Sequence, residues 1–166
     1  TVFNLLGPLT NPAGAQVQLV GVASAAVGEK LARVLNLLDT YRAWVVHGED
    51  GLDEMTLSSP TRVWEVKDRR VHSFTVDPEN AGLHRVPLSE LKGGSAEENA
   101  ATLKELLQGK QGPLRDVVLL NSAAVLVAAE RADDLRQGVQ LAAEVIDSGE
   151  ALQRLEKLVE LSRTLR

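Results

Sequence analysis

The acidic residues of segment 45–55 are the strongest candidates for a functional site in this sequence. An apolar run leads into this segment, and four carboxylates then follow within six residues: Glu49, Asp50, Asp53 and Glu54. We expect such a cluster to repel itself unless a cation holds it. The adjacent pair Asp53 and Glu54 suits Mg²⁺, which takes carboxylate oxygens, keeps several waters and shares its shell with substrate phosphates. The pattern predicts a magnesium site at this pair, and a solvated acidic loop is the alternative.

The elements that precede this loop must position it. Residues 17–23 are an apolar run of strand length, and residues 43–47 are a second buried strand. Between them, residues 29–39 show the apolar spacing of an amphipathic helix, at Leu31, Val34, Leu35 and Leu38. Strand, helix and strand within about 30 residues predict a βαβ unit with parallel strands. The acidic loop then leaves the carboxyl end of a parallel strand, where ligands bind in open α/β sheets.

A β-hairpin is predicted after the acidic loop. Residues 62–66 and 71–76 are rich in β-forming residues and are joined by a polar turn. Trp64 and Phe74 within these runs are assigned to the core. The fold class that we predict is therefore α/β, with a mixed, partly parallel sheet flanked by helices.

Helical patterns fill the rest of the chain. They cover residues 95–108, 114–130, 133–147 and 151–165. The first begins with a capping box at Ser95 and Glu98. The Gly93-Gly94 step before it is interpreted as a flexible cap and not as a phosphate contact. The second pattern is nearly apolar and predicts a central buried helix.

Composition excludes several classes of function. A net charge of −5 and the lack of a Lys/Arg-rich run argue against a nucleic-acid groove or a membrane-surface helix. No apolar run approaches the roughly 20 residues of a membrane span. The chain has no cysteine, which excludes disulfides and thiolate metal sites and fits a cytoplasmic location.

Other catalytic motifs are missing from the sequence. There is no Gly-x-Ser-x-Gly elbow and no His-x-x-x-His pair for zinc. Of the three histidines, His72 and His84 are expected on the surface, and His47 at a strand end is expected to make a structural hydrogen bond. The region 21–30 lacks the Gly-Lys-Ser/Thr ending of a phosphate loop. The chain thus offers carboxylates for a metal without a backbone cradle for phosphate.

Several longer stretches carry a resemblance to a known family. Residues 1–13 read TVFNLLGPLTNPA, which is long and specific. Further landmarks are His47-Gly48 with residues 51–54, and then residues 94–100 and 120–124. Together they resemble the anthranilate phosphoribosyltransferase family, over essentially the whole chain. The resemblance implies the C-terminal domain of a nucleoside phosphorylase / phosphoribosyltransferase-like fold.

The resemblance also implies an activity. The family transfers phosphoribose from phosphoribosyl pyrophosphate (PRPP) to the amino group of anthranilate in tryptophan biosynthesis, and is usually dimeric. Asp53 and Glu54 match the pair that helps to hold Mg²⁺ at the pyrophosphate. The substrate-binding residues that the resemblance implies are Asn4, Gly7, Asn11 and Pro12. We accordingly expect a cytoplasmic homodimer.

We expect residues 1–166 to be the C-terminal α/β part of a longer enzyme. The family's helical N-terminal domain and glycine-rich PRPP loop would then lie upstream, and the isolated chain would be inactive. One alternative is a pyrimidine nucleoside phosphorylase of the same fold. A second is a non-catalytic relative that binds a partner.

Overall fold

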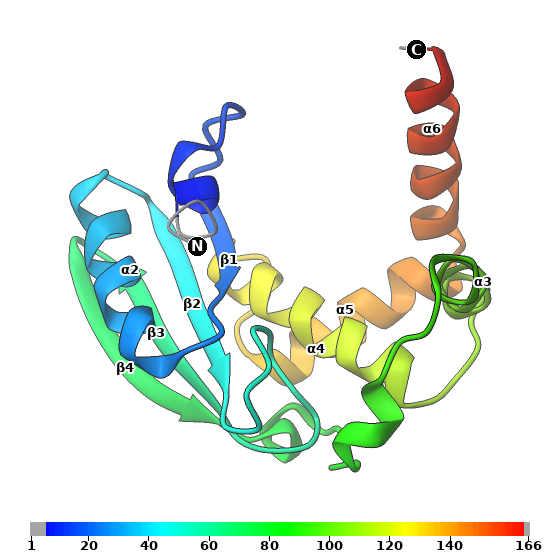
Figure 1. Ribbon diagram of the computed structural model, residues 1–166, viewed down its shortest axis with the longest axis horizontal. Helices are drawn as coiled ribbons and strands as arrows, with labels where there is room; N and C mark the ends of the chain where they lie inside the picture. Colours follow the sequence, from blue (N-terminus) through cyan, green and yellow to red (C-terminus); the bar gives the residue numbers. More distant parts are fainter. Residues whose placement is uncertain (1–5, 165–166) are drawn as a thin grey trace.

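The computed structural model describes residues 6–164, and its centre is one four-stranded sheet (Figure 1). The strands lie in the order β1 (Val17–Gly21), β2 (Arg42–Gly48), β3 (Thr61–Lys67) and β4 (Arg70–Val76). β1 and β2 are parallel, whereas β3 is antiparallel to both of its neighbours. The prediction of a mixed, partly parallel sheet is confirmed.

Helices follow or connect these strands. The α-helices are α2 (Ala25–Leu37), α3 (Ala96–Leu107), α4 (Pro113–Ala128), α5 (Leu135–Asp147) and α6 (Glu150–Thr164). Short 3₁₀ turns occur at η1 (Gly7–Thr10), η2 (Pro78–Ala81) and η3 (Leu88–Leu91). No helix in residues 6–164 combines the length and apolar character that crossing a bilayer requires.

The predicted βαβ unit is confirmed, but the buried stripe of its helix was assigned wrongly. Leu31 and Leu35 are buried as expected, whereas Val34 is 38% exposed and Leu38 is 55% exposed. The stripe instead continues through Gly28 and Ala32. Helix α2 begins four residues earlier than predicted, at Ala25. The small residues of its first turn add almost nothing to an apolar pattern, so the helix start was not visible in the sequence.

Strand β2 is covered on both faces. Ala43 and Val45 pack with α2, while Trp44 and Val46 pack with α4. Figure 1 shows α2 on one side of the sheet and α4 on the other. Every residue of β2 except His47 is buried. A strand buried on both faces is typical of a parallel sheet enclosed by helices.

Only one of the two aromatic residues assigned to the core lies there. Trp64 is 3% exposed, but Phe74 is 36% exposed. Phe74 stands on β4, the outer strand of the described sheet, and contacts Trp44 edge to face with 5.4 Å between ring centroids. The assignment of Phe74 to the core was therefore wrong, because its side chain stays partly exposed on an outer strand of the described sheet.

Helices α4 and α5 approach each other closely at Gly138. The residue is buried in α5, and a Cβ added there would lie 2.8 Å from Cβ and 2.9 Å from Cα of Ala123 on α4. Both distances are shorter than a normal van der Waals contact. The packing of α5 on α4 therefore depends on the missing side chain.

We predict that Gly138→Ala destabilises the protein although alanine is the better helix former. The gain in helix propensity is at most about 1 kcal/mol, and overpacking a tight contact costs roughly 1–3 kcal/mol. Urea unfolding should show a net loss in the free energy of unfolding. Gln140→Ala, at an exposed position of the same helix, is the control and should cause no loss. Equal stabilisation by both variants would contradict the packing argument.

Candidate active site

The acidic loop occupies residues 49–60, between the carboxyl end of β2 and the start of β3. Its predicted place at that edge of the sheet is confirmed. Asp53 and Glu54 are both exposed. Glu54 lines a hollow of about 360 Å³ that is bounded by Leu19 of β1 and by α4. One carboxylate of the pair therefore faces a recess next to the parallel strands.

The pair has no cationic partner within the described part of the chain. No lysine or arginine in residues 6–164 forms an ion pair with Asp53 or Glu54. Burial, followed by the charges of Asp53 and Asp50, raises the pKa of Glu54 above its ordinary value. Negative charge is thus concentrated at this point of the loop without a positive side chain to offset it.

The two carboxylates of Asp53 and Glu54 suit Mg²⁺ better than a metal ion that takes all of its ligands from the protein. Residues 6–164 contain no group of three or more His, Cys, Asp or Glu side chains that could hold a metal ion. Two adjacent carboxylates are what Mg²⁺ commonly takes from a protein when water and substrate phosphates complete its shell. Asp53 and Glu54 are the residues that would hold it.

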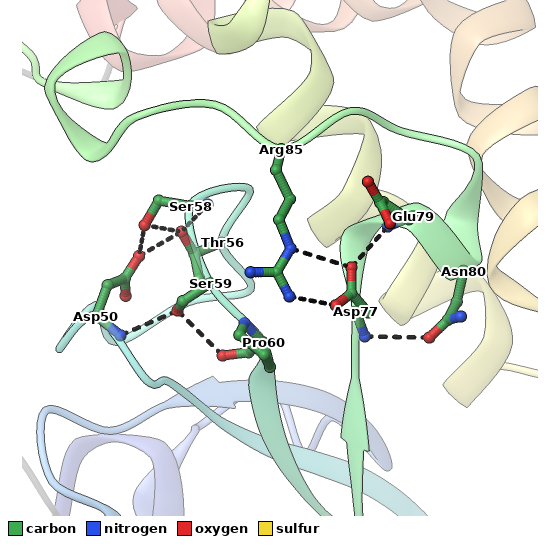
Figure 2. A network of polar contacts seen from close by, with 9 residues as sticks. All are labelled: Asp50, Thr56, Ser58, Ser59, Pro60, Asp77, Glu79, Asn80 and Arg85. Carbon is green, nitrogen blue, oxygen red and sulfur yellow. Dashed lines mark hydrogen bonds and ion pairs between the residues drawn. The ribbon is translucent and has the colours of Figure 1, made fainter.

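Asp50 has a different role from its neighbours. Its Oδ2 accepts hydrogen bonds from the hydroxyls of Thr56, at 2.6 Å, and Ser58 (Figure 2). Its Oδ1 accepts from the backbone N–H of Leu52 at 3.1 Å. Asp50 therefore ties the two halves of the loop together. The expectation that all four carboxylates need a cation is wrong for Asp50, because hydroxyl and amide donors satisfy it.

The hydrogen bonds to Asp50 also determine the direction in which its pKa shifts. Burial alone would raise the pKa of this carboxyl, but the bonds from Ser58, Thr56 and Leu52 together outweigh burial and lower it. The signal in the sequence was the run of hydroxyl residues that follows the acidic segment, which was not used in predicting the site. An ion pair between Arg85 and Asp77 stands beside this network (Figure 2).

Two further contacts fix the backbone around the acidic pair. Gly21, at the end of β1, lies so close to the carbonyl of Asp53 that any Cβ there would overlap it. Asn121 of α4 makes two hydrogen bonds to the backbone of Met55, the residue after Glu54. Asn121 lies in the landmark 120–124, but the sequence assigned neither residue a role, because their partners are distant along the chain.

The histidines lie where they were expected. His47 is half-buried, and its Nδ1 is 2.8 Å from the carbonyl oxygen of Val22, so it ties β2 to the segment after β1. The structural role predicted for His47 is confirmed. His72 and His84 are exposed.

The residues implied as substrate-binding lie apart from the acidic pair. Asn4 falls outside the described residues. Gly7, Asn11 and Pro12 are exposed and precede the amino end of β1, whereas the acidic loop is at the carboxyl end of the sheet (Figure 1). The Asn11 side chain accepts a hydrogen bond from the N–H of Ala13 at 2.9 Å. Their contact with substrate stays a prediction.

We predict that Asp50→Ala lowers the free energy of unfolding at pH 7 by about 1 kcal/mol, because charge-assisted hydrogen bonds are lost at a half-exposed, water-screened site. The folded pKa of Asp50 lies below the ordinary value of 3.8. Its stabilisation is therefore complete above that value and is lost as the pH falls through the folded pKa. Urea unfolding at pH 7, 5 and 3 should show the two proteins converging only in acid. A difference that is the same at every pH would contradict this assignment.

Comparison with known proteins gives a consistent result. The family model described as "Glycosyl transferase family, a/b domain" matches residues 1–152. Anthranilate phosphoribosyltransferase of Dehalococcoides mccartyi is 52% identical over 167 residues, covering 99% of this chain and 49% of that protein. The enzyme of Thermomicrobium roseum is 54% identical over 168 residues, covering 99% of this chain and 48% of that protein. The chain thus spans about half the length of these relatives.

Solved structures show the same fold. Anthranilate phosphoribosyltransferase from Thermus thermophilus superposes with a TM-score of 0.87 at 46% identity, over 98% of this chain and 48% of that one. The enzyme from Saccharomyces cerevisiae, in complex with PRPP and Mg, gives 0.85 at 32% identity, over 94% and 45%. The resemblance seen in the sequence is confirmed. The chain belongs to the glycosyl transferase family, as its a/b domain.

Proposed function

We propose that this chain is the C-terminal α/β part of an anthranilate phosphoribosyltransferase, which transfers phosphoribose from PRPP to anthranilate in tryptophan biosynthesis. The observation that carries the proposal is the unpaired Asp53-Glu54 pair at the carboxyl end of β2, in a chain whose relatives bear that enzyme's name. The Saccharomyces cerevisiae relative was solved with PRPP and Mg, which supports the same reading of the pair.

The reaction explains why a metal-binding pair is needed. The bond between the ribose carbon and the pyrophosphate breaks, a bond from that carbon to the anthranilate nitrogen forms, and the amine loses a proton. A bound Mg²⁺ would offset the charge on the departing pyrophosphate. The role of Asp53 and Glu54 is to hold that ion, and the role of the loop around them is to keep both carboxylates in place.

The phosphate cradle is proposed to lie elsewhere in a longer protein. Three backbone donors at the start of α3 are used locally: Gly94 N–H donates to Asn99, Ser95 N–H to Glu98, and Glu98 N–H to Ser95. The predicted capping box is thus present. The N–H groups of Gly94 and Ser95 are already bonded and are not free to bind a phosphate. We propose that a glycine-rich PRPP loop and a helical domain upstream supply the missing contacts.

The surface of α6 supports this division of the enzyme. Helix α6 has no buried residue, and Leu158 and Leu161 are 63% and 55% exposed. Figure 1 shows α6 extending away from the sheet, with α3 near its lower end. Exposed leucines on a helix of this kind are suited to packing against further protein. The homodimer and the cytoplasmic location belong to the same proposal and follow from the family resemblance.

The names of the relatives favour the transferase over a pyrimidine nucleoside phosphorylase of the same fold. Those compared above are all anthranilate phosphoribosyltransferases. A non-catalytic relative that binds a partner would not need the unpaired carboxylates of Asp53 and Glu54. Assays of the full-length enzyme with anthranilate and with nucleosides would separate these functions.

We predict that Asp53→Ala combined with Glu54→Ala lowers turnover of the full-length enzyme by roughly 100-fold or more, because lost electrostatic stabilisation of developing charge has effects of this size. The fold should persist, since both side chains are exposed. Steady-state assays over a range of Mg²⁺ concentrations would measure the loss. Asp133→Ala with Glu144→Ala removes the same charge at exposed positions elsewhere and should not reduce turnover. Unchanged turnover of the Asp53/Glu54 variant at limiting Mg²⁺ would remove the pair from the mechanism.

We also predict that the isolated 166-residue chain does not catalyse the transfer. Two carboxylates cannot orient PRPP, and orientation alone supplies several kcal/mol of the barrier reduction, up to roughly 7–11. The assay is the loss of anthranilate fluorescence with PRPP and Mg²⁺, using the full-length enzyme as positive control. Turnover close to that of the full-length enzyme would place the phosphate-binding residues within this chain.

A further inference from the structure

The side-chain amide of Asn121 forms two hydrogen bonds with the backbone of Met55. Its Oδ1 accepts the N–H of Met55 at 3.0 Å, and its Nδ2 donates to the carbonyl of Met55 at 2.8 Å. Nδ2 also donates to the carbonyl of Val117, one turn earlier in α4, at 2.9 Å. Only a primary amide supplies an acceptor and two donors in this arrangement. The pairing joins residues 66 positions apart, so tertiary structure alone creates it.

Met55 directly follows Glu54, so these two hydrogen bonds hold the backbone next to a proposed metal ligand. The Met55 side chain is fully buried, which leaves its backbone little freedom. Asn121 and Glu54 also line the same hollow of about 360 Å³. The peptide between Glu54 and Met55 is thus held against α4 at the point where the Glu54 side chain turns outward.

The other side of the acidic pair is held separately. The carbonyl of Leu52 accepts the N–H of Gly48 at 2.8 Å, and the N–H of Leu52 donates to Asp50 at 3.1 Å. The Asp53 carbonyl rests against Gly21. The two carboxylates therefore stand on a short stretch of backbone with one anchor before it and one after it. The anchor after it is Asn121.

We propose that Asn121 is a positioning residue for the magnesium-binding pair, which fixes the backbone of Glu54 so that both carboxylates present their oxygens to one ion. The inference rests on the proposed function of Asp53 and Glu54. Preorganised ligands lose less freedom when the ion binds, so loosening this anchor weakens Mg²⁺ binding without removing a ligand.

The sharpest test is Asn121→Ser in the full-length enzyme. A serine hydroxyl in a helix can bond the carbonyl four residues earlier, so it retains the bond to Val117 while both bonds to Met55 are lost. We expect the dissociation constant of Mg²⁺, measured by calorimetry with saturating PRPP, to rise about tenfold, as is typical when outer contacts of metal ligands are lost. Hydrogen exchange should accelerate in residues 50–57 while α4 keeps its protection.

Asn99 provides a matched control. Its amide makes the same pair of bonds to the backbone of Gly94, at 2.8 and 3.1 Å, far from the acidic loop in sequence and at an exposed site. Asn99→Ser should leave the Mg²⁺ dissociation constant unchanged. Asn121→Thr, which fills more of the vacated space and retains the bond to Val117, serves as the second variant if Asn121→Ser does not fold.

The outcomes separate this inference from the proposed function. The Asp53→Ala/Glu54→Ala variant is measured in the same titration. If it loses Mg²⁺ binding while the Asn121 variants bind as the wild type does, the positioning role is overturned and the metal pair stands. Equal weakening by Asn99→Ser would also overturn the positioning role. Wild-type affinity in the Asp53/Glu54 variant would instead overturn the proposed metal pair.

Discussion

Strand β2 is buried on both faces, and this burial fixes the point from which the acidic loop begins. Helix α2 covers one face through Ala43 and Val45, and α4 covers the other through Trp44 and Val46. A central strand enclosed in this way is held in register with β1 on one side and β3 on the other. The acidic loop therefore starts from a rigid point, and its position relative to α4 is set by the core.

The carboxylates of the acidic loop have two kinds of surroundings. Asp50 turns toward Thr56, Ser58 and the N–H of Leu52, so its charge is satisfied inside the loop and stabilises the turn. Asp53 and Glu54 have no such donors within residues 6–164 and face outward. Of the four acidic residues, Asp50 thus builds the loop, whereas Asp53 and Glu54 are available to a cation. The division follows from which side chains the hydroxyls at 56 and 58 can reach.

Contacts between distant segments give the pair its rigidity. Asn121 approaches Met55 from α4, and Gly21 approaches Asp53 from β1. The first depends on the packing of α4 against the sheet, and the second on the pairing of β1 with β2. A substitution in the core that shifts α4 would therefore move the acidic loop, although it touches no carboxylate. In the function proposed above, the stability of the core and the binding of Mg²⁺ would be coupled through this backbone.

Much of this protein could be read from its sequence alone. Local periodicity was sufficient for the βαβ unit, the hairpin and the capping box at Ser95, because these depend on residues near one another. The Asp53-Glu54 pair was identified from residue type and from its place after a strand. Tertiary structure decided the rest: the role of Asp50, the exposure of Phe74 at the sheet edge, and the Asn121 and Gly21 contacts. These depend on which segments meet in space, and no periodic pattern along the chain records the identity of a partner 66 residues away.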